Sequence, residues 1–345
     1  MSSSTTLQDV ADYVGVSSAT VSRALNGSPS VKPETVKRIR EAALELNYQP
    51  NVAARMLSGG PSDTVCLVLP SLSKQALSRF YYASLIAGAE ETANQEGLHL
   101  LIKNKQETNA FFSLIDQQRV GGVLLRVGHN QSLEQRYIRR LRQAEVPFVL
   151  IGGQMQGSRD LSIYIDVIGG ARALAHHFAE QGYERILYVS GPKRNADSND
   201  RYYGFRLGLT EKGYAPEQLL VAQGDYTPES GYRAAEEHLR RDAIDAVFAA
   251  TDHTALGVLT YCAARRISVP GEIAVAGYDD QDYAAYTFPS LTTVRQPVYE
   301  LGQHAIEQLL YAMRTRRRKE HPIILSPTLV VRDSTLRIRD GKRPR

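Results

Sequence analysis

Apolar residues recur at helical spacing near the start of the chain, in short stretches separated by turn signals. The first stretch places Val10, Ala11 and Val14 on one face of a helix. Thr6 can cap this helix, with Asp9 three residues later at the spacing of a capping box. The pattern predicts a short amphipathic helix that buries one stripe.

Gly15 supplies a tight turn, and a second helix is predicted after it. Ser17 is a suitable N-cap, and Val21 and Leu25 form the inward face. Two short helices joined by a tight glycine turn form a helix-turn-helix unit. The N-terminal end of its second helix enters the DNA major groove, where an arginine fork matches guanine O6 and N7. The outward residues of this end, which we predict to read bases, are Ser18, Ala19, Ser22 and Arg23.

A third helix is predicted from Pro33, a residue favoured at the first helical position. Its expected buried face consists of Val36, Ile39, Ala43 and Leu46. A further short helical pattern covers residues 51–57 and ends at two glycines and a proline, residues 59–61. We therefore expect a helix-turn-helix head over residues 1–49, followed by a hinge helix and linker over residues 50–60.

From residue 64 onward, apolar runs typical of buried strands alternate with helical patterns. The first series has strands at residues 65–69, 98–103, 121–127 and 146–151, with a helix at 80–96. The second series has strands at residues 163–166, 185–189, 219–222, 246–249 and 273–276, and helices at 167–181, 201–212, 228–240 and 253–264. Such alternation forms doubly wound parallel sheets. We predict a small all-α helix-turn-helix head plus an α/β core of two doubly wound subdomains.

The chain is expected to recross near residues 292–295, giving a helix at 298–313 on the first half and a strand at 328–332 that returns to the second. The core would then cover residues 61–345, with subdomain 1 at about 61–162 and 293–325, and subdomain 2 at about 163–292 and 326–340. Ligands of such sheets bind beyond the carboxyl ends of the strands. The cleft between the halves is the expected site, and hinge closure the expected motion.

Net charge does not by itself indicate a nucleic-acid binder. The formal charge of the chain is +4, and residues 1–60 carry six basic and five acidic side chains, a balance of +1. Specific affinity for DNA would then depend on a dimer, on helix N-termini facing phosphates and on the hinge. The basic run at residues 314–319 is interpreted as a solvated loop, and the basic C-terminal residues as a frayed tail.

Cysteine content and hydropathy restrict where the protein is expected to work. Cys66 and Cys262 are isolated in apolar stretches, which predicts buried, reduced thiols and no disulfide framework. No apolar run approaches the length of a membrane helix, and the N-terminus lacks the pattern of a signal peptide. We expect a cytoplasmic protein with no membrane partner.

The head contains five closely spaced strings, namely Leu7-Gln8-Asp9-Val10-Ala11, Gly15-Val16-Ser17, Thr20-Val21-Ser22-Arg23, Leu25-Asn26 and Leu46-Asn47-Tyr48-Gln49-Pro50-Asn51. In these strings the head strongly resembles that of the LacI/GalR family of transcription regulators, and the resemblance continues weakly to Arg332. It implies a homodimer that reads a pseudo-palindromic operator, with a core like that of periplasmic binding proteins. It also implies that the hinge segment, residues 51–57, folds only when it binds DNA. Asn51, Ala54 and Leu57 would be its DNA contacts, with Leu57 inserted as an apolar wedge in the minor groove.

Polar residues that follow predicted strands are the candidates for binding an effector. Asp166, Arg201 and Asp279 lie at such positions, and carboxylates with an arginine can bracket vicinal hydroxyls. The resemblance carried by Arg201-x-x-Gly204-Phe205 and Val275-Ala276-Gly277-Tyr278-Asp279-Asp280 implies that Arg201 and Asp279 contact the effector. It further implies a ring-stacking role for Tyr226, cleft aromatics at Tyr81 and Tyr82, and a cleft residue at Gln296. Asp252 and Asp280 are instead expected to make structural hydrogen bonds or helix caps.

Several alternatives to a sugar-controlled repressor stay open at this stage. Arg79, beside the cleft aromatics, would admit an acidic or phosphorylated effector, and purine-binding relatives carry similar Arg and Asp motifs. No metal or cofactor is expected, because none of the eight histidines has a metal-ligand spacing and no phosphate-binding or nucleophile motif is present. A sugar-converting enzyme of similar core fold is a weak alternative, and an architectural DNA-binding protein would need no cleft.

Overall fold

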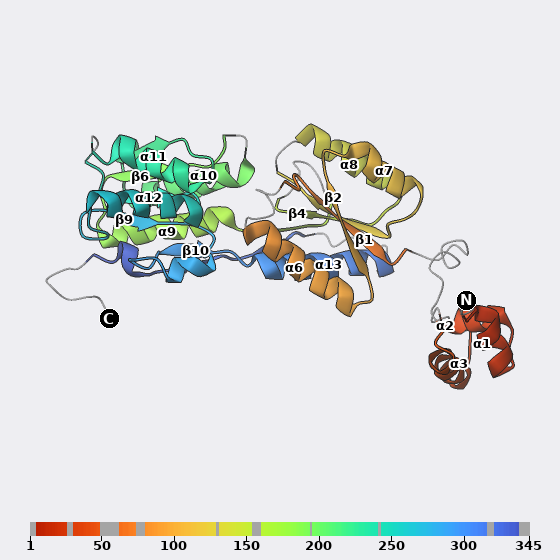
Figure 1. The fold of residues 1–345 in the computed structure, drawn as a ribbon. Helices are drawn as coiled ribbons and strands as arrows, with labels where there is room; N and C mark the ends of the chain where they lie inside the picture. Colours follow the sequence, from red (N-terminus) through yellow and green to blue (C-terminus); the bar gives the residue numbers. More distant parts are fainter. Residues whose placement is uncertain are drawn as a thin grey trace. The chain divides into compact units, whose positions relative to one another are not determined.

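The computed structural model describes residues 5–25, 30–48, 62–73, 80–128, 131–153, 160–193, 195–240, 243–315 and 321–337. The chain divides into two compact units, Met1–Ser62 and Asp63–Arg345, drawn in Figure 1. The predicted hinge residues Asn51, Ala54 and Leu57, and the cleft residue Arg79, lie outside the described residues. The two units are treated separately below.

The first unit contains three helices, α1 (Leu7–Val14), α2 (Ser18–Leu25) and α3 (Pro33–Glu45). Thr6 and Asp9 form the predicted capping box, in which the Thr6 amide donates to Asp9 Oδ2 at 2.7 Å. Gly15 adopts a left-handed φ of 76°, which ends α1. The Ser17 hydroxyl accepts the Thr20 amide at 3.1 Å, so the predicted cap of the second helix is also present.

A small apolar core holds the three helices of this unit together. It contains Val10, Ala11 and Val21 as predicted, and Ile39 and Ala42 from α3. Ala43, predicted for the buried face, is only partly buried and packs against the edge of this core. Ile39 is buried as predicted, and Val36 and Leu46 pack against the core, so the predicted face of α3 differs only in that Ala42 is more buried than Ala43.

The second unit is an α/β core of two lobes, each built on a parallel sheet (Figure 1). The first sheet has six strands in the order β11-β5-β4-β3-β1-β2. Its strands are β1 (Thr64–Leu69), β2 (His99–Asn104), β3 (Gly122–Arg126), β4 (Phe148–Ile151), β5 (Ser162–Ile165) and β11 (Ile323–Leu325). β1 pairs with β2 and β3 in parallel register, and β3 pairs with β4.

Alternate residues of β1 face opposite layers of helices, as a buried parallel strand requires. Val65, Leu67 and Leu69 pack toward α6 (Phe80–Gln95) and α13 (Val298–Thr315), whereas Cys66 and Val68 pack toward α7 (Thr108–Asp116) and α8 (Gln131–Gln143). Figure 1 shows these helix pairs on the two faces of the first sheet. α6 and α13 approach closely because Gly88 and Gly302 face each other's backbones.

The second lobe repeats this plan on a four-stranded sheet in the order β7-β6-β8-β9. The strands are β6 (Ile186–Val189), β7 (Leu219–Ala222), β8 (Ala246–Ala249) and β9 (Ala274–Ala276). One face is covered by α9 (Val167–Gln181) and α10 (Ala196–Glu211), and the other by α11 (Pro228–His238) and α12 (Asp252–Arg265). Short 3-10 helices lie at Pro216–Gln218, Asp282–Ala285 and Asp333–Thr335.

The point at which the chain changes lobe differs from the prediction. β5 was expected to open subdomain 2 at residue 163, but it pairs with β4 and with β11 in the first sheet. The lobe therefore changes after β5, where Asp166 begins α9. The sequence could not show this because a buried parallel strand looks the same in either sheet.

The crossover segments form a small sheet of their own. β10 (Thr293–Arg295) pairs antiparallel with β12 (Thr328–Val330), and their residues Val294 and Leu329 pack on the core of the second lobe, so β12 returns to the second lobe as predicted. The helix between them, α13, packs on the first lobe as expected. Among the described residues, no helix combines the length and the apolar character that spanning a bilayer requires.

Candidate DNA-reading helix and effector site

The predicted base-reading residues lie on α2, the second helix of the helix-turn-helix unit. Ala19 and Arg23 are exposed, and Ser18 and Ser22 are half-buried. Val21 and Ala24 fill the opposite face of the helix. The helix thus presents a short, small-residue face with one arginine, the arrangement that can enter a major groove.

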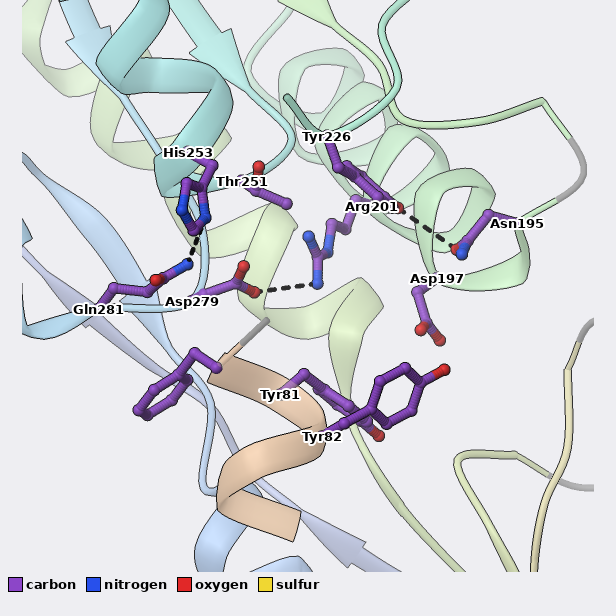
Figure 2. A pocket seen from close by; sticks show the side chains of 11 residues that line it. Tyr81, Tyr82, Asn195, Asp197, Arg201, Tyr226, Thr251, His253, Asp279 and Gln281 are labelled. Atoms are coloured by element: carbon purple, nitrogen blue, oxygen red, sulfur yellow. Dashed lines mark hydrogen bonds and ion pairs between the residues drawn. The ribbon is translucent and has the colours of Figure 1, made fainter. Parts of the chain in front are cut away.

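The core unit has a cavity where the ends of its two lobes meet, and Figure 2 shows the side chains around it. The cavity volume is about 70 Å³, and the space rises to about 580 Å³ when the open solvent at its mouth is included. Its lining residues are Phe80, Tyr81, Tyr82, Asn195, Asp197, Arg201, Tyr226, Thr251, His253, Asp279 and Gln281. It therefore combines aromatic side chains with several hydrogen-bonding groups, a composition typical of small-molecule sites.

Arg201 and Asp279 meet in this cavity, as Figure 2 shows. Arg201 Nη2 donates to Asp279 Oδ1 at 3.2 Å, with Arg201 6% and Asp279 14% exposed. Arg201 Nη1 donates to the Ala250 carbonyl, and the guanidinium lies 4.1 Å from the centroid of the Tyr278 ring. The arginine is thus fixed from three sides, and a ligand would meet a rigid guanidinium rather than a mobile one.

Two cavity residues have a backbone conformation that non-glycine residues rarely adopt. Asp279 has a φ of 119° and Tyr226 a φ of 70°. The Asp279 amide is held by a hydrogen bond to the Val294 carbonyl at 2.9 Å. Such unfavourable conformations cluster at binding sites, where the surrounding structure enforces them.

Aromatic side chains form walls of the cavity on both lobes. Tyr81 and Tyr82, from the start of α6, lie edge to face with centroids 5.5 Å apart, and face the residues of the second lobe in Figure 2. Tyr226 stands opposite them and packs over Gly191, where an added Cβ would lie 2.1 Å from Tyr226 Cε1. Burial raises the pKa of Tyr81 and of Tyr226 to about 12, so both phenols are neutral at pH 7.

Five of the seven predicted effector residues line this cavity, namely Tyr81, Tyr82, Arg201, Tyr226 and Asp279. Gln296 lies behind it, where its amide donates to Asp279 Oδ1 at 2.7 Å, and lines an adjoining cavity. Asp166 lies elsewhere: it is the N-cap of α9, accepting the Gly169 amide at 2.8 Å, and faces a second cavity. Gln296 thus supports Asp279 from behind the cavity, and Asp166 caps α9 and lines the neighbouring cavity rather than this one.

Six lining residues were not predicted: Phe80, Asn195, Asp197, Thr251, His253 and Gln281. Asn195 and Asp197 were missed because α10 begins at residue 196 rather than at 201 as predicted. The missing signal was an N-cap: the Asn195 side chain accepts the Ser198 amide at 3.0 Å. His253 was missed because its only visible feature was a place at the start of a helix; its Nδ1 lies 3.0 Å from Gln281 Nε2.

Asp252 and Asp280 have structural roles, although neither is a helix cap. Asp252 is fully buried and accepts hydrogen bonds from Thr293 Oγ1 at 2.6 Å and the Gln281 amide at 2.8 Å. Asp280 accepts from Arg295 Nε and Arg332 Nη2, both at 2.6 Å. These two carboxylates attach the loop after β9 to α12 and to the crossover strands.

Comparison with known proteins covers both units. Residues 6–51 match the family described as bacterial regulatory proteins, lacI family, and residues 175–335 match a periplasmic binding protein-like domain. The chain is 33% identical over 336 residues to the HTH-type transcriptional regulator CelR of Thermobifida fusca, covering 95% of this chain and 98% of that one. It is 31% identical over 337 residues to the repressor PurR of Pectobacterium carotovorum, covering 95% and 96%.

Solved structures with similar folds include regulators with small molecules bound. A CelR–cellobiose complex matches with a TM-score of 0.71 and 31% identity, covering 96% of this chain and 99% of that one. The lac repressor dimer bound to operator and the anti-inducer ONPF matches with a TM-score of 0.79 and 27% identity, covering 97% and 100%. The chain therefore belongs to the lacI family of bacterial regulatory proteins, as a helix-turn-helix transcription regulator with a periplasmic-binding-protein-like core, and it is not an enzyme.

Proposed function

We propose that this regulator is a repressor that binds a pseudo-palindromic operator as a homodimer and is controlled by a neutral sugar bound between its two lobes. The observation that carries the effector proposal is the Arg201–Asp279 pair facing the aromatic wall of Tyr81 and Tyr82. As a DNA-binding regulator of this family it works in the cytoplasm, where it meets both DNA and metabolites.

The polar groups of the cavity suit vicinal hydroxyls. A guanidinium offers donors in a fixed fork, and a carboxylate offers acceptors, so a pair of neighbouring hydroxyls can bond to Arg201 and Asp279 together. Asn195 and Gln281 add groups that can both donate and accept. The aromatic side chains supply apolar faces, which cover the C–H face of a pyranose ring. The combination favours a polyhydroxylated ring over an apolar ligand.

Charge balance favours a neutral effector over a phosphorylated one. Arg201 is paired with Asp279 inside the cavity, and Arg126, behind Tyr81, is paired with Asp197. A phosphate would have to compete with these carboxylates for either arginine and would meet their negative charge. A sugar hydroxyl can instead join each pair without displacing it.

The relatives support the sugar and also indicate a second candidate. CelR, to which the chain is similar over nearly its full length, has a solved complex with cellobiose. PurR relatives are similarly close in sequence, and a purine could stack on Tyr226 and bond to Arg201 and Asp279. A purine corepressor is therefore the alternative effector.

A thermal-shift screen of the full chain tests the effector class directly. The panel contains cellobiose and its monosaccharide, their phosphates, and purine bases. We expect stabilisation by a neutral sugar, because a ligand that binds only the native state raises the melting temperature. Arg201→Met should abolish the shift, whereas Arg206→Met, on the outer part of α10, should retain it. Stabilisation by a phosphate or purine alone would reject the neutral-sugar proposal.

Dimerisation is supported by exposed aromatic residues on the second lobe. Tyr286 and Phe288 are almost entirely exposed two positions apart on one loop, and neighbouring exposed apolar side chains of this size can form a patch that a partner covers. The lac repressor relative was solved as a dimer on its operator. We further propose that Asn51, Ala54 and Leu57 form the hinge contacts with the minor groove at the centre of the operator, and that Ser18, Ala19, Ser22 and Arg23 read each half-site.

A further inference from the structure

Arg126 is a buried arginine at the end of β3 that connects the two lobes. Its Nη2 lies 3.0 Å from Asp197 Oδ1 and 2.8 Å from Asp197 Oδ2, so this one nitrogen contacts both carboxylate oxygens. Arg126 belongs to the first lobe and is 1% exposed, while Asp197 lies in the first turn of α10 in the second lobe and is 23% exposed. Among the ion pairs between described residues of the core unit, the others lie within one lobe or involve the crossover and C-terminal segments.

The backbone around Arg126 is fixed by a second buried pair. Lys105 Nζ donates to the Arg126 carbonyl and to Glu134 Oε1, the latter at 2.8 Å. The same Glu134 oxygen accepts the Gly128 amide at 2.9 Å. Lys105 and Glu134 are both almost fully buried. These hydrogen bonds hold the backbone at the end of β3, from which the Arg126 side chain extends.

The guanidinium itself is enclosed by the first lobe. Its Cζ lies 5.4 Å from the centroid of the Tyr81 ring, and its Nη1 donates to the Val127 carbonyl. The guanidinium fits here because residue 152 is a glycine: an added Cβ at Gly152 would lie 2.1 Å from Arg126 Nη1. Arg126 Nε has no hydrogen-bond partner within the described structure. The buried positive charge of the Arg126 guanidinium is therefore balanced by the carboxylate of Asp197.

Asp197, unlike Arg126, reaches the cavity. Its carboxylate lies beside Tyr81 and Tyr82 in Figure 2 and one helical turn before Arg201 on α10. It lines the effector cavity and also the neighbouring cavity that Asp166 faces. The position of this acceptor relative to the aromatic wall is therefore set from the first lobe.

We propose that Arg126 is a positioning residue for the effector site, acting through Asp197: the pair holds this acceptor against the aromatic wall and ties the lobes together before any ligand arrives. The claim that the pair affects effector binding, the ligand part, rests on the proposed sugar function. The claim that it joins the two lobes, the lobe part, does not. Loss of either partner should let the lobes separate and should weaken effector binding by the same factor, because Arg126 touches the ligand only through Asp197.

Inter-lobe distances measured by electron spin resonance test the lobe part without a ligand. Spin labels are placed at Gln135→Cys on α8 and Glu237→Cys on α11, both exposed, in protein diluted with unlabelled chain. Arg126→Gln and Asp197→Asn should each shift the distribution to longer or broader distances, and the double variant should match the single ones. Arg126→Lys, which keeps one bond and the charge, should restore part of the shift.

Asp200→Asn, three residues along α10 at the neighbouring cavity, is the matched control and should leave the distances unchanged. Unchanged distances in both Arg126→Gln and Asp197→Asn would overturn the proposal. Should Asp197→Asn fail to fold, Arg126→Gln alone decides, since the carboxylate it leaves is partly exposed and can be hydrated.

Calorimetry with cellobiose as the probe tests the ligand part. Both variants should weaken binding together by about 5- to 150-fold, the range of a coupling free energy between sites. A loss in Asp197→Asn but not in Arg126→Gln would show that Asp197 binds the sugar independently and would overturn the positioning role. If wild type does not bind cellobiose or any other sugar of the panel, the effector proposal fails, while the distance measurement still decides the role of Arg126 in joining the lobes.

Discussion

Asp279→Asn separates effector binding from DNA binding most cleanly. The change keeps the size of the side chain and one oxygen, but it removes the negative charge beside Arg201. In fully buried pairs, losing one partner destabilises a protein by about 3–5 kcal/mol. In Asp279→Asn, the Arg201 guanidinium keeps its hydrogen bond to the Ala250 carbonyl and its contact with the Tyr278 ring. The amide oxygen of the new asparagine can replace Asp279 Oδ1 as the acceptor for Arg201 and Gln296. We therefore expect a loss of only about 1–3 kcal/mol in the free energy of unfolding.

Effector affinity should fall further, because a hydrogen bond to a charged group contributes about 1.5–3 kcal/mol. This corresponds to roughly 10- to 150-fold weaker binding of the sugar. Calorimetric titration measures this loss, urea unfolding measures stability, and operator titration without sugar should match wild type.

Asp280→Asn is the matched control, since its carboxylate bonds to Arg295 and Arg332 and does not line the cavity. Equal loss of sugar binding in Asp279→Asn and Asp280→Asn would refute the reasoning, as would loss of operator binding in Asp279→Asn alone.

Four further predictions concern the head, the hinge, the aromatic wall and a buried carboxyl. Arg23→Ala should weaken operator binding by roughly 1–3 kcal/mol and relax the preference for one base pair in each half-site. Binding to a set of operator variants measures this preference. A uniform loss on all sequences would indicate that Arg23 contacts a phosphate instead of a base. Leu57→Ala should reduce the affinity for the operator and the bending of the operator DNA. If this variant bends the operator as much as wild type in a gel-shift assay, Leu57 does not act as a wedge. Gly191→Ala should push Tyr226 from its position and remove roughly 0.5–1.5 kcal/mol of ring contact with a sugar, about a 2- to 13-fold loss in calorimetry; unchanged affinity would mean that Tyr226 does not contact the ligand. Burial, with the charge of Asp279, raises the pKa of Asp252 to about 7, so between about pH 4 and pH 7 the native carboxyl keeps a proton that the unfolded chain has lost. The stability that this group contributes is therefore complete below about pH 4 and falls by up to about 1.4 kcal/mol per pH unit as the pH rises to 7. Urea unfolding of Asp252→Asn at several pH values should lack this fall.

Local patterns predicted the fold well where each element carries its own signal. The Thr6–Asp9 capping box, the Gly15 turn and the Ser17 cap are all visible in the sequence because capping depends on neighbouring residues only. Sheet membership is different, since β5 is apolar in either lobe and its pairing with β4 is a long-range property. The edge strand β11 was missed because it has only three residues, of which Ile324 is exposed, and such a short strand carries little pattern.

The effector site was predictable to the extent that motifs mark the ends of strands. Arg201 and Asp279 follow β6 and β9, so parallel strands bring them to one edge of the second sheet. Arg126 is different, because it is the last residue of β3 and is an isolated charge in an apolar stretch of the sequence. Its pairing with Asp197 arises only when the two lobes meet, which no local pattern encodes.

The central claim is that one small molecule bound in the core changes the affinity of the head for DNA. A ligand can do so only if it binds the two conformations of the core unequally. The most direct measurement is fluorescence anisotropy of a labelled operator, selected from genomic fragments, titrated with the protein at increasing concentrations of the sugar found in the thermal-shift screen. We expect wild-type operator affinity to fall by about 5- to 150-fold at saturating sugar, and Arg201→Met to bind the operator equally with and without it. An operator affinity that does not change with a sugar shown by calorimetry to bind the core would contradict the account.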